Sequence, residues 1–210
     1  MSSTLPERAR TLEAPGSERP QTRRPIQFLR EFLRRPREVG SVVPSSRFLE
    51  ERLVDVSGAA RARLVVEFGP GTGGTTRALL RALPFDARLL AIELNPSFAA
   101  DLEAFADPRL AVHRGSALEL QDAVAQRKLP APDVVISGIP FSTMPEDTGR
   151  AILRAVWAAL PPGGRFVAYQ FRDAVGVLGR DILGRPDVSL ALLNVPPMRV
   201  YCWRKPANAA

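Results

Sequence analysis

Apolar residues along this chain occur as short continuous runs separated by longer stretches in which they recur every three or four positions. The runs predict strands at 63–68, 87–94, 109–114, 133–138 and 165–171, and the stretches between them predict helices around 74–83, 96–106, 116–127 and 146–160. Alternation of this kind is typical of βαβ units, whose parallel sheet carries helices on both faces. Two further runs, DVSLALLNV and MRVYCWRK, are joined by Pro196 and Pro197 and predict an antiparallel hairpin. We therefore expect an α/β fold with a seven-stranded, mostly parallel sheet that ends in a hairpin.

The N-terminal region has a different pattern. Residues 1–24 are polar and rich in Pro, Ser and Arg, which predicts a disordered tail. The stretch PIQFLREFLRR (25–35) predicts a helix between two prolines, and SSRFLEERLVDV after Pro44 predicts a second one. The first helix is amphipathic: its apolar side holds Ile26, Leu29, Phe32 and Leu33 with Phe28 at the edge, and Arg30, Arg34 and Arg35 lie on the other side or the flanks. We expect a tail (1–24), an amphipathic helix and cap (25–58) and one main domain (59–210).

The positive charge is concentrated in this N-terminal region. The chain has a formal net charge of +7, and residues 19–37, with seven arginines and one acid, account for +6 of it. The remaining body is nearly neutral, whereas an enzyme acting on nucleic acid more often spreads basic residues over its substrate face. We therefore expect a localised anion-binding segment and no nucleic-acid partner.

Composition excludes several kinds of site. One cysteine, Cys202, and one histidine, His113, rule out a structural disulfide or a clustered Cys/His metal centre, so we expect no metal. No apolar run reaches the roughly 18 residues of a membrane span, and the N-terminus lacks the apolar core of a secretory signal. These features fit a reducing, cytoplasmic compartment.

The stretch VVEFGPGTGGTT (65–76) is the most informative motif. It follows the first predicted strand and opens the first helix, which is where open α/β sheets bind their ligands. Glycines there let the backbone turn sharply and approach a ligand. Three interpretations are open: a tight turn without a ligand, a dinucleotide site read as G-x-G-x-x-G, or the pattern E-x-G-x-G-x-G through Glu67, Gly69, Gly71 and Gly73.

The third pattern resembles the first motif of class I S-adenosylmethionine (SAM) methyltransferases, and the charge of Glu67 favours it. A carboxylate repels a pyrophosphate, whereas SAM has no phosphate and carries an ammonium and a sulfonium. The chain also lacks room for the separate substrate domain of an oxidoreductase. We therefore expect SAM as the cofactor, with Thr72 completing the loop.

Other residues at the strand ends complete a predicted SAM site. Glu93 ends the second strand, where a carboxylate can accept hydrogen bonds from both ribose hydroxyls; otherwise it is an ordinary exposed acid. Leu94 and Asn95 follow, with Leu94 against the adenine. After the third strand, Ser116 and Ala117 occupy the place where methyltransferases often carry an Asp that binds the adenine amino group. We expect Glu119 to be a solvated surface acid.

The fourth strand ends in SGIPFS (137–142), where this superfamily holds the methyl acceptor. Enzymes that methylate amino groups of bases carry Asn/Asp-Pro-Pro-aromatic or Asn-Leu-Pro-aromatic sequences there, so the missing amide residue weakens a base-methylating role, although Phe141 could stack on a base. The alternative is a purely structural turn. We expect carbonyls around Gly138–Pro140, with Ser137 and Tyr169, to hold an acceptor amine; Tyr169 is otherwise an ordinary strand tyrosine.

Five segments in order, FLREFLRRPREVGSVVPSSRFL, VVEFGPGTGGTT, SGIPFSTMP, GGRFVAYQF and NVPPMRVYCWRK, resemble the bacterial phospholipid N-methyltransferases. The resemblance covers about residues 25–205 and departs from the family after YQF. It implies a Rossmann-like methyltransferase that converts phosphatidylethanolamine to phosphatidylcholine at the inner face of the membrane. The family is related to ribosomal RNA adenine dimethylases, which gives RNA methylation as the alternative function.

The resemblance also gives the N-terminal segment a role. A short helix with apolar and arginine faces can lie in the interface of an anionic membrane; alternatively its apolar face docks on the body. Ser41 and Ser46 lie in a loop expected to cover the cofactor, or they cap the second helix.

Overall fold

A computed structural model describes residues 46–194 and 197–207 of this chain. The predicted tail (1–24), the amphipathic helix (25–35) and Ser41 lie outside the described residues.

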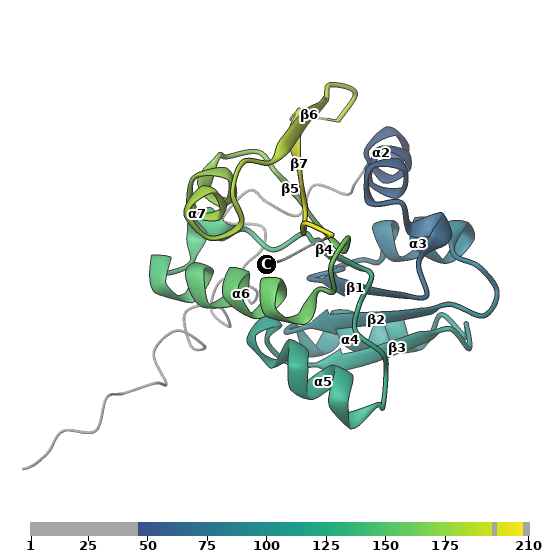
Figure 1. Cartoon of the computed structure of the whole chain (residues 1–210). Coiled ribbons are helices and arrows are strands. Elements are labelled where there is room, and N and C mark those ends of the chain that lie inside the picture. Colours follow the sequence, from purple (N-terminus) through teal and green to yellow (C-terminus); the bar gives the residue numbers. More distant parts are fainter. Residues whose placement is uncertain (1–45, 195–196, 208–210) are drawn as a thin grey trace, which may run out of the picture.

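The core of the molecule is a seven-stranded sheet, as predicted. Its strand order is β3-β2-β1-β4-β5-β7-β6 (Figure 1). Strands β1 to β5 are parallel, and β7 pairs antiparallel with both β5 and β6. The strands are β1 (Leu64–Phe68), β2 (Arg88–Glu93), β3 (Leu110–Arg114), β4 (Val134–Ser137), β5 (Arg165–Gln170), β6 (Asp187–Ala191) and β7 (Met198–Arg204). This arrangement confirms the Rossmann-like methyltransferase fold with a C-terminal antiparallel hairpin.

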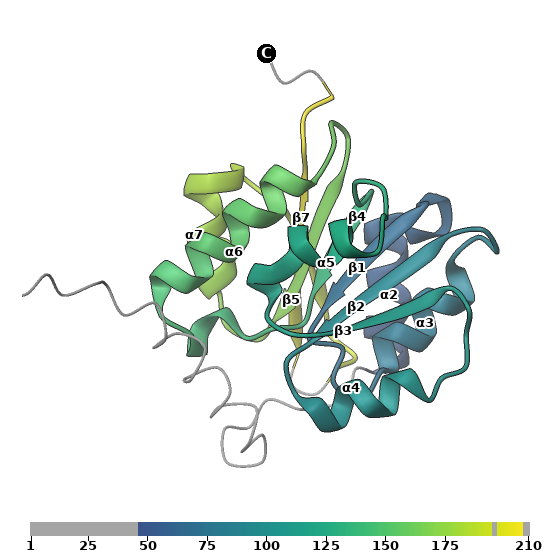
Figure 2. The same ribbon diagram turned by 90° about the horizontal axis from the view of Figure 1, so that it is seen from below.

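Helices cover both faces of the sheet (Figures 1 and 2). Residues of α2 and α3 pack in one buried cluster with one face of the central strands, and residues of α5, α6 and α7 pack in a second cluster on the opposite face. The described helices are α2 (Arg47–Ser57), α3 (Gly74–Ala82), α4 (Pro96–Glu103), α5 (Leu120–Gln126), α6 (Glu146–Ala159) and α7 (Ala174–Leu183), with 3-10 turns η1 (Ala59–Arg61), η2 (Ala117–Glu119) and η3 (Phe141–Thr143). None of these helices is long and apolar enough to cross a membrane.

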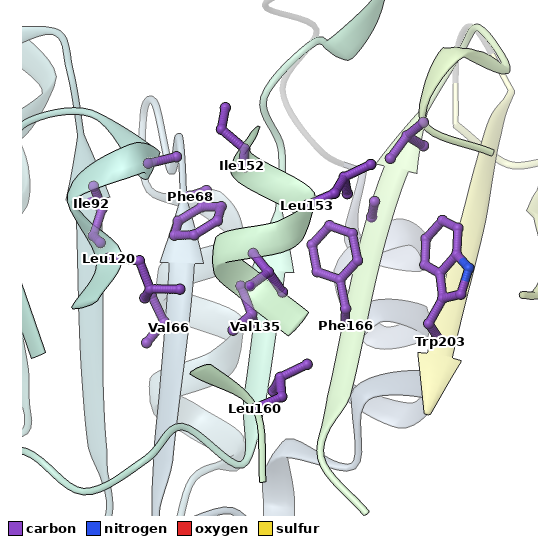
Figure 3. Packing of buried hydrophobic residues seen from close by; sticks show 14 of the residues in the cluster. Val66, Phe68, Ile92, Leu120, Val135, Ile152, Leu153, Leu160, Phe166 and Trp203 are labelled. Carbon is purple, nitrogen blue, oxygen red and sulfur yellow. The ribbon is translucent and has the colours of Figure 1, made fainter. Parts of the chain in front are cut away.

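Strand pleating sorts the side chains between the two faces. Along β1, Val66 and Phe68 belong to the cluster under α5, α6 and α7, whereas Val65 belongs to the cluster under α2 and α3. Figure 3 shows Val66 and Phe68 against Ile152 of α6 and neighbouring residues. Each strand residue therefore has a defined side, which fixes where the polar residues at the strand ends point.

Helix α2 is packed on the sheet. Leu49 and Leu53 are buried in the same cluster as Val65 of β1. Ser46 caps the helix by accepting a hydrogen bond from the Leu49 amide, and Gly58 ends it in a left-handed conformation. Part of the predicted cap (25–58) is thus joined to the main domain through a shared core.

Helix α7 was not among the predicted helices, because Gly176 and Gly179 within it lower its intrinsic propensity. Tertiary packing explains these glycines. A Cβ at Gly176 would lie 2.8 Å from the Tyr201 ring, and one at Gly179 would lie 2.5 Å from the Trp203 ring. The two glycines let α7 approach the aromatic side chains of β7, where Trp203 stacks on Phe166 with ring centroids 5.5 Å apart.

Candidate functional site

The carboxyl ends of β1, β2 and β4 meet at one edge of the sheet. The strands are parallel neighbours, and Phe68 of β1 pairs with Ile92 of β2 and with Ser137 of β4. The loops that follow these strands therefore lie side by side, as expected at the switch point of a doubly wound sheet. This edge brings together the glycine loop, Glu93 and the SGIPF segment.

The glycine loop requires glycine for two different reasons. Gly69, Gly71 and Gly73 all have positive φ, at 63°, 56° and 78°. A Cβ at Gly69 would lie 2.7 Å from Ile139, and one at Gly73 would strike Phe105, so these two positions also have no space. Gly71 differs, because a Cβ there would meet nothing within 4 Å. The backbone at Gly71 thus borders open space, which a ligand can fill.

Glu67 lies beneath this loop and is almost completely buried. It pairs with Ile136 of β4, so its side chain points to the face covered by α2 and α3. Thr76 of α3 donates a 2.7 Å hydrogen bond to Glu67 Oε2, and Oε1 has no partner among the described residues. Burial raises the pKa of this carboxyl to about 8 despite the hydrogen bond from Thr76.

Glu93 joins two loops of the site. Its Oε2 accepts a hydrogen bond from the Gly71 amide at 3.0 Å, and its Oε1 accepts one from the Asn95 amide at 2.8 Å. Burial raises the pKa of Glu93, and these amide hydrogen bonds lower it in part. Glu93 is only 2% exposed, which excludes the alternative of an ordinary exposed acid. Asn95 also caps α4 by accepting from the Ser97 amide.

The residues after β3 form a tight capping arrangement. Ser116 Oγ accepts from the Leu118 amide at 3.2 Å, and Glu119 Oε1 accepts from the Ser116 amide at 3.1 Å. Glu119 Oε2 also lies 2.9 Å from His113 Nε2. The Glu119 side chain is 45% exposed, so it lies at the surface as predicted, but it also takes part in this capping arrangement, which the prediction did not include. The Ser116 hydroxyl is already used as a cap, and buried Ala117 follows it at the start of η2.

At the end of β4, the predicted acceptor residues divide between the two faces. Ser137 pairs with Ala168 of β5, so its side chain lies on the α6 face, whereas Tyr169 lies on the opposite face. The Tyr169 hydroxyl covers Gly138, at the place where a Cβ would stand. Pleating therefore separates the two side chains, and their joint action on one amine stays a prediction that this placement does not favour.

The carbonyls expected to hold an amine already have partners. Gln170 Nε2 donates to the Ile139 carbonyl at 2.7 Å, and the Thr143 hydroxyl donates to the Pro140 carbonyl at 2.9 Å. Two buried polar atoms nearby, Ser137 Oγ and Gln170 Oε1, have no partner among the described residues. Ser137 pairs with Ala168 of β5, and Gln170 is two residues after Ala168 on the same strand. Residues two apart on a strand share a face, so Gln170 and Ser137 lie on the same side of the sheet. Ser137 was selected from the sequence; that Gln170 leaves a second unpaired oxygen on the same face is seen only in the structure.

Asn194 belongs to this edge of the sheet and was not selected in the sequence analysis. It lies in the NVPP segment after β6, is buried, and its Oδ1 accepts a hydrogen bond from the Ser46 amide at 3.0 Å. The segment that begins α2 and the C-terminal hairpin are therefore joined at the same edge of the sheet as the glycine loop. Both segments had been singled out in the sequence, but their contact could not be read from it.

The site fits SAM on two structural grounds. Gly71 leaves open space above the loop, and Glu67 presents a buried carboxyl oxygen without a partner among the described residues. When bound, SAM supplies an electrophilic methyl group on a sulfonium. Glu67, Glu93 and the loop amides would hold its cationic and ribose parts. Glu50 of α2, whose pKa burial also raises, adds a further acid near Glu67.

Comparison with known proteins agrees with this site. The family described as "Methyltransferase domain" matches residues 65–164. The ornithine lipid N-methyltransferase of Singulisphaera acidiphila is 33% identical over 141 residues, which cover 66% of this chain and 73% of that protein. The ribosomal RNA small subunit methyltransferase A of Erythrobacter litoralis is 35% identical over 98 residues, which cover 45% of this chain and 32% of that protein.

A solved structure shows the same fold. The 1,6-didemethyltoxoflavin-N1-methyltransferase of Burkholderia thailandensis, crystallised with its substrate and S-adenosylhomocysteine, superposes with a TM-score of 0.64 at 19% identity, covering 93% of each chain. This chain belongs to the class I SAM-dependent methyltransferases. Its cofactor is SAM.

Proposed function

We propose that this protein is a lipid N-methyltransferase that methylates the amino group of a membrane lipid. The observation that carries the proposal is the relation to the ornithine lipid N-methyltransferase, which extends over 73% of that protein. The match to the ribosomal RNA enzyme covers only 32% of its length. The resemblance of the N-terminal and NVPP segments to phospholipid N-methyltransferases supports the same class of acceptor.

Phosphatidylethanolamine is the acceptor that we propose first, with its mono- and dimethylated forms as intermediates toward phosphatidylcholine. Ornithine lipid is the second candidate, because the relative of 33% identity is named for it. Both lipids present a primary amine at a membrane surface, so the same reaction serves either one.

The proposed reaction is an in-line displacement. The amine lone pair attacks the methyl carbon, the carbon–sulfur bond breaks, and its electron pair returns to sulfur, leaving a neutral thioether. The amine must first lose a proton, which a water molecule can accept; if the amine pKa is about 10.4, as for lysine, this costs about 5 kcal/mol at neutral pH. Positioning supplies most of the remaining catalysis.

Three residues at the end of β4 and β5 suit the positioning role. The Tyr169 hydroxyl above Gly138 can accept a hydrogen bond from an amine on the α2/α3 face. Ser137 Oγ and Gln170 Oε1 offer unpaired acceptors on the other face, where an ordered water would complete their hydrogen bonding. We assign Tyr169 to the acceptor amine, and Ser137 and Gln170 to the support of the Gly138–Pro140 segment.

The N-terminal segment completes the proposal. Residues 25–35, with Ile26, Phe28, Leu29, Phe32 and Leu33 on the apolar side and three arginines beside them, would bind anionic lipids and hold the enzyme at the cytoplasmic face of the membrane. Replacing Arg30, Arg34 and Arg35 together by Glu should then strongly weaken co-sedimentation with anionic vesicles and leave SAM affinity unchanged. Native vesicle affinity in this variant would exclude the segment as an anchor.

The deciding experiment is transfer of radiolabelled methyl from SAM to separate acceptors: vesicles with phosphatidylethanolamine, vesicles with ornithine lipid, and ribosomal RNA. We expect label in the lipid phase, with chromatography of the head groups giving the acceptor and the number of methyl groups added. Label in RNA alone would refute the lipid function. Tyr169→Phe should lower kcat with little change in SAM affinity, whereas Tyr169 as a mere packing residue would leave kcat unchanged.

A further inference from the structure

Strand β6 is the edge of the sheet and is covered on one face only. Ser189 faces α2 and accepts a hydrogen bond from Arg52 at 3.2 Å, and Ala191 is buried in the cluster beneath α2. Val188 and Leu190 lie on the opposite face and are more than half exposed. The face of β6 next to α7 thus presents aliphatic side chains to solvent.

This exposed face continues around the end of the hairpin. We define the hairpin-tip patch as Phe48, Phe171, Leu190, Leu192 and Leu193, each more than half exposed. Two hydrogen bonds join its parts: the Ser46 amide to Asn194 brings the start of α2 to the hairpin, and Arg199 Nη1 donates to the Phe171 carbonyl at 3.0 Å. Isolated exposed apolar residues are common, but five linked in this way mark an interaction surface.

The patch lies at the same edge of the sheet as the glycine loop. Both β5 and β6 are antiparallel to β7, so β6 runs parallel to β5 and its carboxyl end lies at the carboxyl ends of the central strands. In Figure 1 the hairpin projects beyond α2 and α7. A surface that docked on the patch would therefore face the edge where methyl transfer is proposed.

Arginines border the patch. Arg199 pairs with Leu190 across the hairpin and donates to the Phe171 carbonyl, and Arg172 follows Phe171 in the chain. Arg199 also lines a groove of about 500 Å³ together with Arg180 of α7 and Arg185, which precedes the amino end of β6. Within residues 46–194 and 197–207, none of these four arginines forms a salt bridge. The groove also contains Asp173, whose Oδ1 accepts a hydrogen bond from the Tyr201 hydroxyl. The groove therefore keeps an excess of positive charge.

We propose that the hairpin-tip patch and its bordering arginines dock on the surface of an anionic lipid bilayer, with Leu192 and Leu193 inserting among the acyl chains and the arginines contacting lipid phosphates. The inference rests on the proposed lipid function and adds a second contact, separate from residues 25–35. Its effect would be to orient the site toward the membrane, beyond simply tethering the protein there.

The composition of the surface favours a bilayer over other partners. Only a bilayer offers an apolar interior directly beneath a layer of phosphates, which matches exposed leucines bordered by arginines. Single-stranded RNA is held by aromatic side chains that stack on bases, whereas three of the five patch residues, including the two assigned to insertion, are leucines. A second copy of the chain would present the same positive charge to itself.

The proposal is tested in the full-length protein by measuring tryptophan fluorescence at the tip and at a distant control position. Leu193→Trp places a fluorophore in the tip, and Phe85→Trp places a control at a 90% exposed position before β2, at the opposite edge of the sheet. With anionic vesicles containing brominated lipid, we expect at least twofold quenching of the Leu193→Trp signal above the native tryptophan background and none for Phe85→Trp. Equal quenching in the two variants, with both proteins bound to vesicles, would overturn the proposal.

Two charge and polarity variants provide the functional arm. Leu192→Ser with Leu193→Ser, and separately Arg172→Glu with Arg199→Glu, should each weaken co-sedimentation with anionic vesicles about tenfold. The matched controls, Phe85→Ser and Arg61→Glu, should bind as the native protein does. Native vesicle affinity in both tip variants would refute the inference. It would also be refuted if RNA or self-association, and not vesicles, changed the fluorescence of the tryptophan in Leu193→Trp.

A water-soluble short-chain phosphatidylethanolamine separates this inference from the proposed function. If the native protein methylates neither this lipid nor short-chain ornithine lipid, the lipid function itself fails. If it does methylate one of them, the tip variants should retain that activity while losing at least fivefold on vesicles. Equal activity of native and tip variants on vesicles would overturn the docking surface alone.

Discussion

The Thr76 hydroxyl donates a hydrogen bond of 2.7 Å to Glu67 Oε2, the only hydrogen bond to this buried carboxyl among the described residues. Burial without a cationic partner keeps the carboxyl protonated up to a pH of about 8. A cationic ligand beside Glu67 would reverse this effect, so the titration of this residue reports on the cofactor.

We predict that Glu67 lowers the stability of the cofactor-free protein as the pH rises. The folded state holds the Glu67 proton up to a pKa of about 8, whereas the unfolded chain releases it near the ordinary glutamate pKa of 4.5. Between these values the folded state binds more protons, so its stability decreases with increasing pH and remains lower above pH 8. The full loss is up to about 5 kcal/mol.

Urea unfolding of the native protein and of Glu67→Gln, at pH 5, 6, 7 and 8, would check this prediction. As the pH rises across this range, the unfolding free energy of the native protein should decrease relative to that of Glu67→Gln. A constant difference would mean that Glu67 is already ionised in the folded protein at pH 5.

We also predict that SAM binding is linked to a proton at Glu67. If the cationic part of SAM lies beside this residue, binding favours the ionised carboxyl and releases a proton below pH 8. Calorimetry in two buffers of different ionisation enthalpy should show this release near pH 7. In Glu67→Gln the release attributable to this group should disappear; an unchanged value would place the SAM cations elsewhere.

Glu93→Gln should weaken SAM binding by about 10- to 100-fold. The substitution removes one of the two carboxylate acceptors that hold the Gly71 and Asn95 amides and are proposed to bind the ribose, at about 1.4–2.7 kcal/mol. The matched control is Glu103→Gln, since Glu103 is exposed and pairs with Arg114 away from the loop. Equilibrium dialysis with labelled SAM measures both; equal affinities would remove Glu93 from the cofactor site.

Gly71→Ala and Gly73→Ala should separate cofactor binding from folding. Both substitutions strain a left-handed residue by about 1–2 kcal/mol. At Gly73 the new methyl group also strikes Phe105, so that variant should show the larger decrease in Tm. At Gly71 the methyl group enters open space, so we expect modest destabilisation with a disproportionate loss of SAM affinity. The reverse order of stabilities would contradict this account of the loop.

Asn194→Ala should lower the stability of the protein by about 1–3 kcal/mol, because the Ser46 amide would lose its partner in a partly buried contact. Ser189→Ala removes another hydrogen bond between the hairpin and α2, but an exposed one, and should change stability by less than about 0.5 kcal/mol. Thermal unfolding distinguishes the two variants. Similar Tm values would show that Asn194 contributes no more than a surface contact.

Periodicity and turn residues were sufficient for most of the fold. The apolar runs located all seven strands. The signal is clearest for β1 and β4, because every residue of these strands is buried and a strand buried on both faces is a nearly continuous apolar run. Helix α7 was missed because Gly176 and Gly179 weaken the local signal, and the reason for them is contact with Tyr201 and Trp203, which are distant in sequence. The Glu67–Thr76 bond and the Glu93–Gly71 bond likewise depend on backbone geometry that no motif specifies.

The sequence by itself determined which strand end carries each motif. A glycine loop follows the first strand, an acid ends the second, and SGIPF follows the fourth, because local spacing decides where a strand ends and a loop begins. Only the tertiary structure decided which of these residues meet. Pleating placed Ser137 and Tyr169 on opposite faces, and the antiparallel return of β7 brought Asn194 to Ser46 and set the exposed leucines beside the cofactor edge. These relationships arise from packing between distant segments, which local preferences do not encode.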